Sequence, residues 1–261
     1  RELLALPARF VCRASLNSMN KRGPDWKIEK TINNNVYLGQ AVLSMTGPKK
    51  KDINQHYSHN NNYFILLVGE IYNYKKLNLI DLNNENNNYI SDTKVLVNLF
   101  EKNSIKQVNN KIDGMYAYIV FDKKNNTLLV SRDPNGEKTL YIYQDKSEII
   151  ISSEVNPILM YKKNISLNTN ILKNYFLTRH FISLEETIFN KILKINPGDQ
   201  IEINLSNRKI KKVNQVKISD YIDPKIYKKN LKKSENDLIK ELDSLFTKNI
   251  KEMIPQNRKL A

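Results

Sequence analysis

The sequence contains a single cysteine, Cys12, which excludes a disulfide within the chain and is typical of a protein from a reducing compartment. It also lacks an apolar run near the roughly 20 residues that a membrane-spanning helix needs. The Leu-Ala-Leu-Pro stretch at residues 4–7 is too short and too poorly flanked for a signal peptide. We therefore expect a cytoplasmic protein without a membrane partner.

Histidine and glycine are also scarce, with three and seven residues. His56 and His59 lie three positions apart in a polar segment without a set of cysteines or carboxylates around them, and His180 stands alone. This is a poor pattern for a metal site. The glycines form no phosphate-binding fingerprint. The chain therefore predicts neither a metal site nor a nucleotide cofactor of its own.

Positive charge is in excess, with 42 Lys and Arg against 27 Asp and Glu and a formal net charge of +15. Such a balance is typical of proteins that bind nucleic acids or anionic membranes. The lysines are, however, spread along the chain and not interleaved with aromatic residues. Asn, Lys, Ile and Tyr are enriched together, as A/T-rich codons would produce. Nucleic-acid binding is therefore the less favoured interpretation.

The chain has 261 residues, 40% of them hydrophobic, which is enough for one large domain or for one domain and the start of another. Strand-like segments follow one another through short turns, as in antiparallel sheets, and helix-like segments lie beside them. A tight turn at residues 196–199 leads into one more strand. The pattern predicts an α+β fold with strands at residues 36–45, 63–68, 116–121, 127–131, 139–143 and 148–152, and helices at residues 154–160 and 168–177.

The end of the strand predicted at residues 63–68 has the composition of a site. Gly69 and Glu70 follow it directly, where the chain leaves the core. Glycine allows close backbone approach and glutamate supplies a charge, a pair that suits a small zwitterionic ligand. An ordinary turn at the end of a strand explains the same two residues equally well.

Two helix starts are predicted from their capping residues. Ser91 is a suitable N-cap for a helix in which Asp92 occupies the first turn, where a carboxylate also favours the helix dipole without any functional role. Ser234 begins a last helix with an apolar stripe that needs a partner. The basic segment at residues 209–233 is interpreted as an irregular linker. Residues 1–14 show neither a helical nor a strand period.

A set of short motifs follows one order along residues 15–200: Arg22-Gly23-Pro24-Asp25, Leu43-Ser44, Gly69-Glu70-Ile71-Tyr72-Asn73, Ser91-Asp92-Thr93, Asp113-Gly114-Met115-Tyr116-Ala117, Arg132-Asp133, Gly136-Glu137-Lys138-Thr139-Leu140-Tyr141, Ser153-Glu154 and Pro197-Gly198. No single motif is specific. The ordered set resembles the glutamine-hydrolysing asparagine synthetases, and residues 38–43 look most like the divergent branch called asparagine synthetase domain-containing protein.

The resemblance implies a class II glutamine amidotransferase domain with the N-terminal nucleophile hydrolase fold, an αββα sandwich of two antiparallel sheets between helix layers. In that family the first residue is a cysteine whose thiol attacks the glutamine carboxamide, with its own α-amine as base. Ammonia then passes to a second domain, which uses ATP and magnesium to activate aspartate. We expect an atypical segment at residues 1–14, the amidotransferase domain at 15–205, a linker at 206–233, and the first helix of a truncated α/β synthetase domain at 234–261.

Three site residues carry over from the family. Glu70 matches the glutamate of its Asn-Gly-Glu motif, and Asp92 matches the aspartate of its Ser-Asp-Thr motif. These two hold the ammonium end of the glutamine substrate. Gly69 matches the glycine whose backbone N–H lies in the oxyanion hole.

Three positions depart from the family. Val68 replaces the asparagine whose amide donates to the oxyanion, and Val42 replaces the arginine that pairs with the substrate carboxylate. Cys12 has too few residues before Arg22 to match the nucleophile and has no free α-amine. It is therefore interpreted as an incidental thiol. No catalytic cysteine is identified.

The favoured interpretation is the glutamine amidotransferase domain of an asparagine synthetase-like protein. Such a domain uses glutamine as its substrate and supplies ammonia to a synthetase domain, and we expect its glutamine hydrolysis to be impaired. A non-catalytic scaffold for a synthetase domain is the alternative, and Val42, Val68 and the missing cysteine motivate it. Nucleic-acid binding is the third hypothesis.

Overall fold

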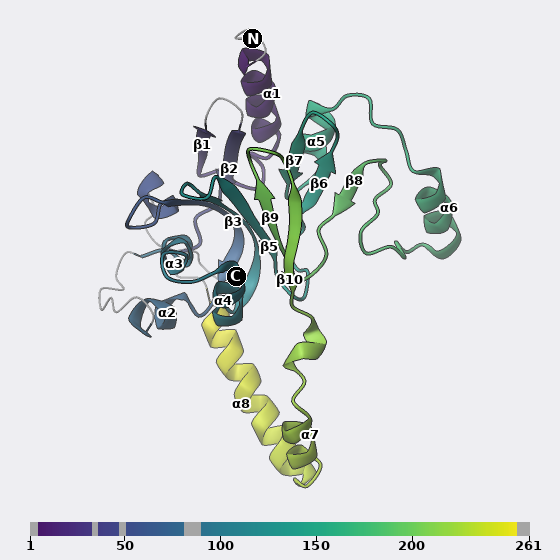
Figure 1. The fold of residues 1–261 in the computed structure, drawn as a ribbon. Coiled ribbons are helices and arrows are strands. Elements are labelled where there is room, and N and C mark those ends of the chain that lie inside the picture. The colour runs from purple at the N-terminus through teal and green to yellow at the C-terminus, as the bar shows by residue number, and fades with distance from the viewer. Residues whose placement is uncertain (1–4, 33–35, 47–50, 81–89, 255–261) are drawn as a thin grey trace.

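The computed structural model describes residues 5–32, 36–46, 51–80 and 90–254, with side chains from Cys12 onward (Figure 1). Residues 1–4 of the expected N-terminal segment and residues 255–261 of the expected synthetase segment lie outside the described residues. Among the helices that are described, none combines the length and the apolar character that a bilayer crossing requires.

A five-stranded antiparallel sheet forms the centre of the fold. Its spatial order is β10 (Ile210–Gln215), β9 (Asp199–Asn204), β5 (Thr127–Arg132), β4 (Gly114–Asp122) and β3 (Tyr63–Ile71). Side chains alternate across the sheet, so that Ile65 and Leu67 of β3 face one buried core while Phe64 and Leu66 face another. Among the described residues β3 ends the sheet, and its outer edge pairs with the backbone only at an isolated bridge between Tyr57 and Phe64.

A second layer of strands packs on the face of the sheet that Phe64 and Leu66 occupy. It consists of a hairpin, β1 (Trp26–Ile32) with β2 (Val36–Val42), and a three-stranded antiparallel sheet of β7 (Ile149–Ser152), β6 (Tyr141–Gln144) and β8 (Ile192–Lys194). The core between the layers includes Ile28 and Leu38 from the hairpin and Val130 from β5. The expected second sheet is therefore present as two separate pieces.

Helices cover both outer faces (Figure 1). On one side α2 (Tyr74–Ile80), α3 (Asp92–Leu99) and α4 (Ile105–Lys111) share a core with β3 and β4. On the other side α1 (Ala5–Ser18) packs against α5 (Val155–Tyr161) and β2, and Ile158 of α5 is buried against β6 and β8. The layers run helix, sheet, strands, helix, which confirms the predicted α+β sandwich.

The remaining elements follow the sandwich core. The helix α6 (Thr169–Thr178) lies on an arm that projects from the body, and a 3-10 turn, η2 (Ile218–Tyr221), leads to α7 (Pro224–Asn230) and α8 (Glu235–Met253) (Figure 1). Both predicted caps are confirmed: the side chain of Ser91 accepts from Lys94 N–H and that of Ser234 accepts from Asp237 N–H.

Two expectations about local structure are wrong, and one strand was missed. Residues 5–14, expected to lack regular structure, belong to helix α1, which docks on α5 and β2. The segment expected to be an irregular linker contributes β10, whose residue Lys212 pairs with the buried carboxylate of Asp199. Lysines are tolerated there because β10 is an edge strand. The strand β1 was missed because its polar residues, such as Lys27 and Glu29, alternate with apolar ones only over a short stretch.

The strand predicted at residues 36–45 ends at Val42. The cause is Asp25, whose carboxylate accepts a hydrogen bond from Ser44 N–H at 2.9 Å while its own N–H donates to the Val42 carbonyl at 3.0 Å. These bonds turn the chain out of the hairpin. As a result, Leu43 and Met45 are free to line a pocket instead of extending β2.

Candidate functional site

Side chains cover most of the free edge of β3. The amide of Gln40 bonds both backbone groups of Leu67, and His56 Nδ1 lies 2.8 Å from the carbonyl oxygen of Ile65. The N–H of Ile71 donates to Asp92 Oδ2 at 3.1 Å. These contacts satisfy polar groups that would otherwise be left without a partner at an edge strand.

Within this series, Gly69 is the position that no side chain of the described residues covers. Backbone groups of alternate residues in an antiparallel strand face the same edge, so the bonds at residues 65, 67 and 71 place the N–H and carbonyl of Gly69 on that edge too. Only glycine fits there. Its φ is +117°, and an added Cβ would lie 1.9 Å from the carbonyl oxygen of Met115.

Asp92 is buried at the start of α3, and its carboxylate is fixed by its neighbours. Oδ1 accepts from Thr46 Oγ1 and from Thr93 N–H, both at 2.7 Å, and Oδ2 accepts from Ile71 N–H. Burial raises the pKa of Asp92, while the hydrogen bonds from Thr46, Ile71 and Thr93 oppose that shift. The position is therefore more than a helix-start acid, because the carboxylate joins three segments of chain.

Glu70 lies in the electrostatic neighbourhood of Asp92. Burial raises the pKa of Glu70, the Asp92 carboxylate raises it further, and Lys138 lowers it. The hydroxyl of Tyr74 is buried without a hydrogen-bond partner, and burial, helped by the charges of Asp92 and Glu70, raises the pKa of Tyr74 to about 12. Because the Asp92 carboxylate makes ionisation of Glu70 less favourable, the two residues together form a spot that favours a bound cation.

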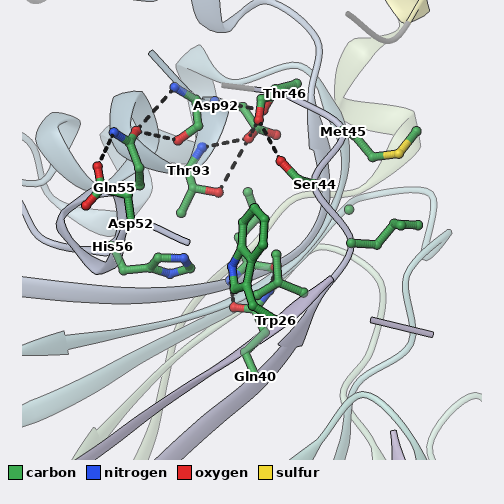
Figure 2. Close-up of a pocket in the computed structure, with 15 residues that line it drawn as sticks. Trp26, Gln40, Ser44, Met45, Thr46, Asp52, Gln55, His56, Asp92 and Thr93 are labelled. Carbon is green, nitrogen blue, oxygen red and sulfur yellow. Dashed lines mark hydrogen bonds between the residues drawn. The ribbon is translucent and has the colours of Figure 1, made fainter. Parts of the chain in front are cut away.

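A pocket opens beside this acidic spot, between the hairpin, the 3-10 turn η1 (Ile53–His56), β3 and the start of α3 (Figure 2). Figure 2 shows the indole of Trp26 next to His56, with Asp92 bonded to Thr46 and Thr93. Of the residues predicted for the site, Gly69, Asp92 and Val42 line the pocket, whereas Glu70 and Val68 do not. The lining also includes Trp26, Gln40, Leu43, Met45, Thr46 and His56.

Trp26, Gln40 and His56 were not predicted as site residues. Gln40 bonds to Leu67, which is 27 positions away in the sequence. The residues next to Gln40 give no indication that its side-chain amide completes the hydrogen bonding of an edge strand. Trp26 lies opposite Val42 in the hairpin, and its Nε1 is buried without a hydrogen-bond partner. In the sequence, only the position of Trp26 directly after the motif at residues 22–25 could have suggested that it belongs to the site.

Cys12 lies within helix α1 and does not line the pocket. Burial raises the pKa of the Cys12 thiol, and the charge of Glu148 raises it further. Both effects disfavour the thiolate that a nucleophile requires. That Cys12 is an incidental thiol stays a prediction.

The other residues considered from the sequence have structural contacts. The guanidinium of Arg132 donates to the carbonyls of Lys138, Gly136 and Ile195, which confirms its interpretation as part of a structural turn. His59 Nε2 lies 2.7 Å from the amide nitrogen of Asn98, whereas His56 bonds to the β3 edge. Within the part of the chain that the structure describes, no group of three or more metal-ligating side chains occurs.

Comparison with known protein families identifies the family of this chain. A family model described as "Glutamine amidotransferase domain" matches residues 6–214, which includes helix α1 without its first residue and the five strands of the central sheet without the last residue of β10. The chain belongs to this glutamine amidotransferase family. The match includes most of residues 1–14 and of β10, which had been expected to lie outside the domain.

The curated relatives of this chain include proteins named as asparagine synthetases. A Methanocaldococcus jannaschii protein named as glutamine-hydrolysing asparagine synthetase 2 is 30% identical over 237 residues, 81% of this chain and 45% of that protein. The glutamine-hydrolysing asparagine synthetase 2 of Bacillus subtilis is 25% identical over 236 residues, 85% of this chain and 30% of the relative. The chain thus spans less than half the length of these relatives.

The chain is also similar to the solved structure of the glutamine phosphoribosylpyrophosphate amidotransferase from B. subtilis. The identity is 19%, the TM-score is 0.42, and the match covers 61% of this chain and 31% of that one. So weak a likeness carries no argument about function.

Proposed function

We propose that this amidotransferase domain binds glutamine by its ammonium end through Glu70 and Asp92 and hydrolyses it poorly. The observation that carries the proposal is the meeting of these two carboxylates at the free edge of β3, directly beside the uncovered backbone of Gly69. An ammonium group relieves the repulsion between the carboxylates. The glutamine carboxamide would then face the N–H of Gly69, which supplies one oxyanion donor.

The reduced activity follows from what lies around that donor. Val68 offers no side-chain amide for the second oxyanion bond, and the loss of one such donor typically lowers turnover by about 10² to 10³. The pocket lining contains no thiol, and Cys12 lies in α1. Val42 offers no charge for the substrate carboxylate. The described residues thus support binding of the substrate more than attack on its carboxamide.

For the whole protein we propose a part in asparagine synthesis. The relatives are named as glutamine-hydrolysing asparagine synthetases, and more than half of their length lies outside the match. Ammonia released from glutamine would serve an ATP-dependent and magnesium-dependent synthetase domain that converts aspartate to asparagine. The exposed apolar residues of α8, such as Leu242 and Phe246, suit packing against such a domain.

The alternative function is a scaffold that supports a synthetase domain without using glutamine. Val42 and Val68 favour this alternative, because each removes a polar contact to the substrate at a position that lines or adjoins the pocket. Nucleic-acid binding has only the net charge in its favour. Retention on DNA or RNA that is absent or independent of salt would dispose of it.

Two measurements on one protein sample test the proposal. Isothermal titration calorimetry with L-glutamine should detect binding that Asp92→Asn and Glu70→Gln weaken, and release of glutamate should stay near the rate in buffer. Rapid glutamate release would contradict the proposed impairment. Absence of glutamine binding in the folded protein would overturn the proposal and leave the scaffold.

A further inference from the structure

The segment after β2 is joined to the start of α3 by a two-way contact between one pair of residues. The hydroxyl of Thr46 donates to Asp92 Oδ1 at 2.7 Å (Figure 2) and accepts from Asp92 N–H at 3.3 Å. The two residues lie 46 positions apart in the sequence. Because a hydroxyl can donate and accept at the same time, Thr46 contacts both the charge of Asp92 and the first turn of its helix.

Thr46 reaches this place because the chain leaves the hairpin after Val42. Ser44 then fixes the segment, since its N–H donates to the carboxylate of Asp25 at 2.9 Å and its hydroxyl donates to the Thr46 carbonyl at 3.3 Å. Both Thr46 and Asp92 line the pocket. One residue of the pocket wall is therefore held by another.

This contact determines how the Asp92 carboxylate faces a ligand. Oδ1 accepts from Thr46 Oγ1 and from Thr93 N–H, both at 2.7 Å, and these two bonds use its two acceptor positions. Oδ2 accepts from Ile71 N–H at 3.1 Å and has a second acceptor position. The carboxylate cannot rotate without losing these bonds. Oδ2 is therefore the oxygen that suits a ligand ammonium group.

The same contact acts on the charge of Asp92. Burial raises the pKa of Asp92, and of the hydrogen bonds that lower it again, the bond from Thr46 has the largest effect. A donor to a carboxylate favours the ionised form, which is the form that attracts an ammonium group. Removal of the Thr46 hydroxyl should therefore make Asp92 easier to protonate.

The titratable and charged groups on the elements around Asp92 do not replace this donor. Within the described part of the chain they are Glu70 on β3, Tyr74 on α2, Asp52 and His56 at η1, and Lys94 on α3 itself. Glu70 and Asp52 are acidic, and burial lowers the pKa of His56, which leaves it neutral at pH 7. Lys94 donates to the backbone carbonyls of Asn54 and Tyr57.

We infer that Thr46 is a positioning residue for amine recognition in this pocket: its hydroxyl keeps the Asp92 carboxylate charged and holds Oδ2 toward the ammonium group. The inference rests on the proposed function, because it concerns the same carboxylate and the same ligand group. It adds a residue outside the resemblance-derived set, and it makes the pH range of glutamine binding depend on a neutral side chain.

The first test needs no ligand. Carboxyl carbon NMR follows the titration of Asp92 in the full chain, in Thr46→Val, which keeps the shape of the side chain without the hydroxyl, and in Thr46→Ser, which keeps the hydroxyl. We expect Asp92 to titrate at a higher pH in Thr46→Val and near its original pH in Thr46→Ser. Circular dichroism establishes that both variants are folded. An unchanged titration of Asp92 in folded Thr46→Val would overturn the inference, whether or not the protein binds glutamine.

The second test is calorimetry with L-glutamine at pH 7 and pH 5. Thr46→Val should bind about tenfold more weakly than the natural sequence at pH 7, and the difference should widen at pH 5, where more of its Asp92 is protonated. Thr46→Ser should stay within about threefold of the natural sequence. Equal affinities of the natural sequence and Thr46→Val at both pH values would overturn the inference and leave the proposed function intact. Absence of binding by the natural sequence would overturn the proposed function and the part of Thr46 in amine recognition.

Thr187→Val is the matched control. Its hydroxyl is buried and donates to the Ile192 carbonyl at 2.8 Å, outside the pocket lining. The loss of this hydroxyl should leave both the titration of Asp92 and the affinity for glutamine unchanged. A loss of affinity as large as that of Thr46→Val would show a general effect of deleting a buried hydroxyl and would overturn the specific role of Thr46.

Discussion

The side-chain amide of Gln40 forms with Leu67 the two hydrogen bonds that a neighbouring strand would supply: Nε2 donates to the Leu67 carbonyl at 2.5 Å, and Leu67 N–H donates to Oε1 at 3.2 Å. His56 and Asp92 bond to the same edge at Ile65 and Ile71. The candidate site lies at the gap in this series, where Gly69 is uncovered.

Gln40→Glu should destabilise the fold, because the substitution removes the donor to Leu67 and sets a carboxylate oxygen against the Leu67 carbonyl. We expect a loss of about 1–3 kcal/mol in the free energy of unfolding, measured by urea denaturation at pH 7. Gln144→Glu, at an exposed position of β6, is the control. Equal effects of the two substitutions would contradict the role of Gln40.

Gly69→Ala should be severely destabilising, by about 3 kcal/mol or more, since its Cβ would clash with the Met115 carbonyl at a positive φ. Gly39→Ala is the matched control within a strand. There the new Cβ would meet only side-chain atoms of Tyr37 and Leu16, at 3.0 and 3.2 Å. Thermal unfolding of both variants checks the difference, and a mild effect at Gly69 would contradict the need for glycine at this position.

Glu70→Gln should make the stability of the fold less dependent on pH. Burial and Asp92 raise the pKa of Glu70 above its ordinary value of 4.5, so the folded protein holds a proton that the unfolded chain has lost as the pH rises past 4.5. The contribution of Glu70 to the stability is therefore largest below pH 4.5 and is lost as the pH rises through its folded-state pKa.

With glutamine at position 70 this decline should flatten and the variant should be the more stable protein at pH 7, at the expense of amine binding. Urea denaturation between pH 4 and pH 8 measures the effect. A steeper decline in Glu70→Gln than in the natural sequence would contradict the proposed repulsion between Glu70 and Asp92.

Cys12 should react slowly with iodoacetamide at pH 7, no faster than free cysteine, because burial and the charge of Glu148 raise the pKa of its thiol. Glutamine should not protect it, since Cys12 does not line the pocket. Mass spectrometry of the labelled protein follows the reaction. Rapid alkylation that glutamine suppresses would identify Cys12 as a site thiol after all.

The sequence was sufficient for features that depend on local chemistry. The apolar run before Gly69 predicted β3, Ser91 and Ser234 predicted helix starts, and the short turns predicted antiparallel sheets. The ordered motifs indicated a sandwich of two strand layers between helices. The split of the second layer into a hairpin and a three-stranded sheet could not be read from them.

Features that depend on distant contacts were not predictable in the same way. Residues 5–14 have no clear helical period, yet α1 is helical where it docks on α5 and β2. Lysine-rich β10 looks like a linker until it pairs with β9. The pocket roles of Trp26 and His56 arise only when the hairpin and η1 come together with the edge of β3.

The dissociation constant of L-glutamine for Val42→Arg tests most directly whether the pocket keeps the ammonium half of the glutamine site and lacks the carboxylate half. Val42→Leu controls for size at the same position. Calorimetry should show glutamine binding at least about tenfold more tightly to Val42→Arg than to the natural sequence, because a guanidinium at the end of β2 supplies the missing charge. Unchanged or weaker glutamine binding by folded Val42→Arg would contradict the claim.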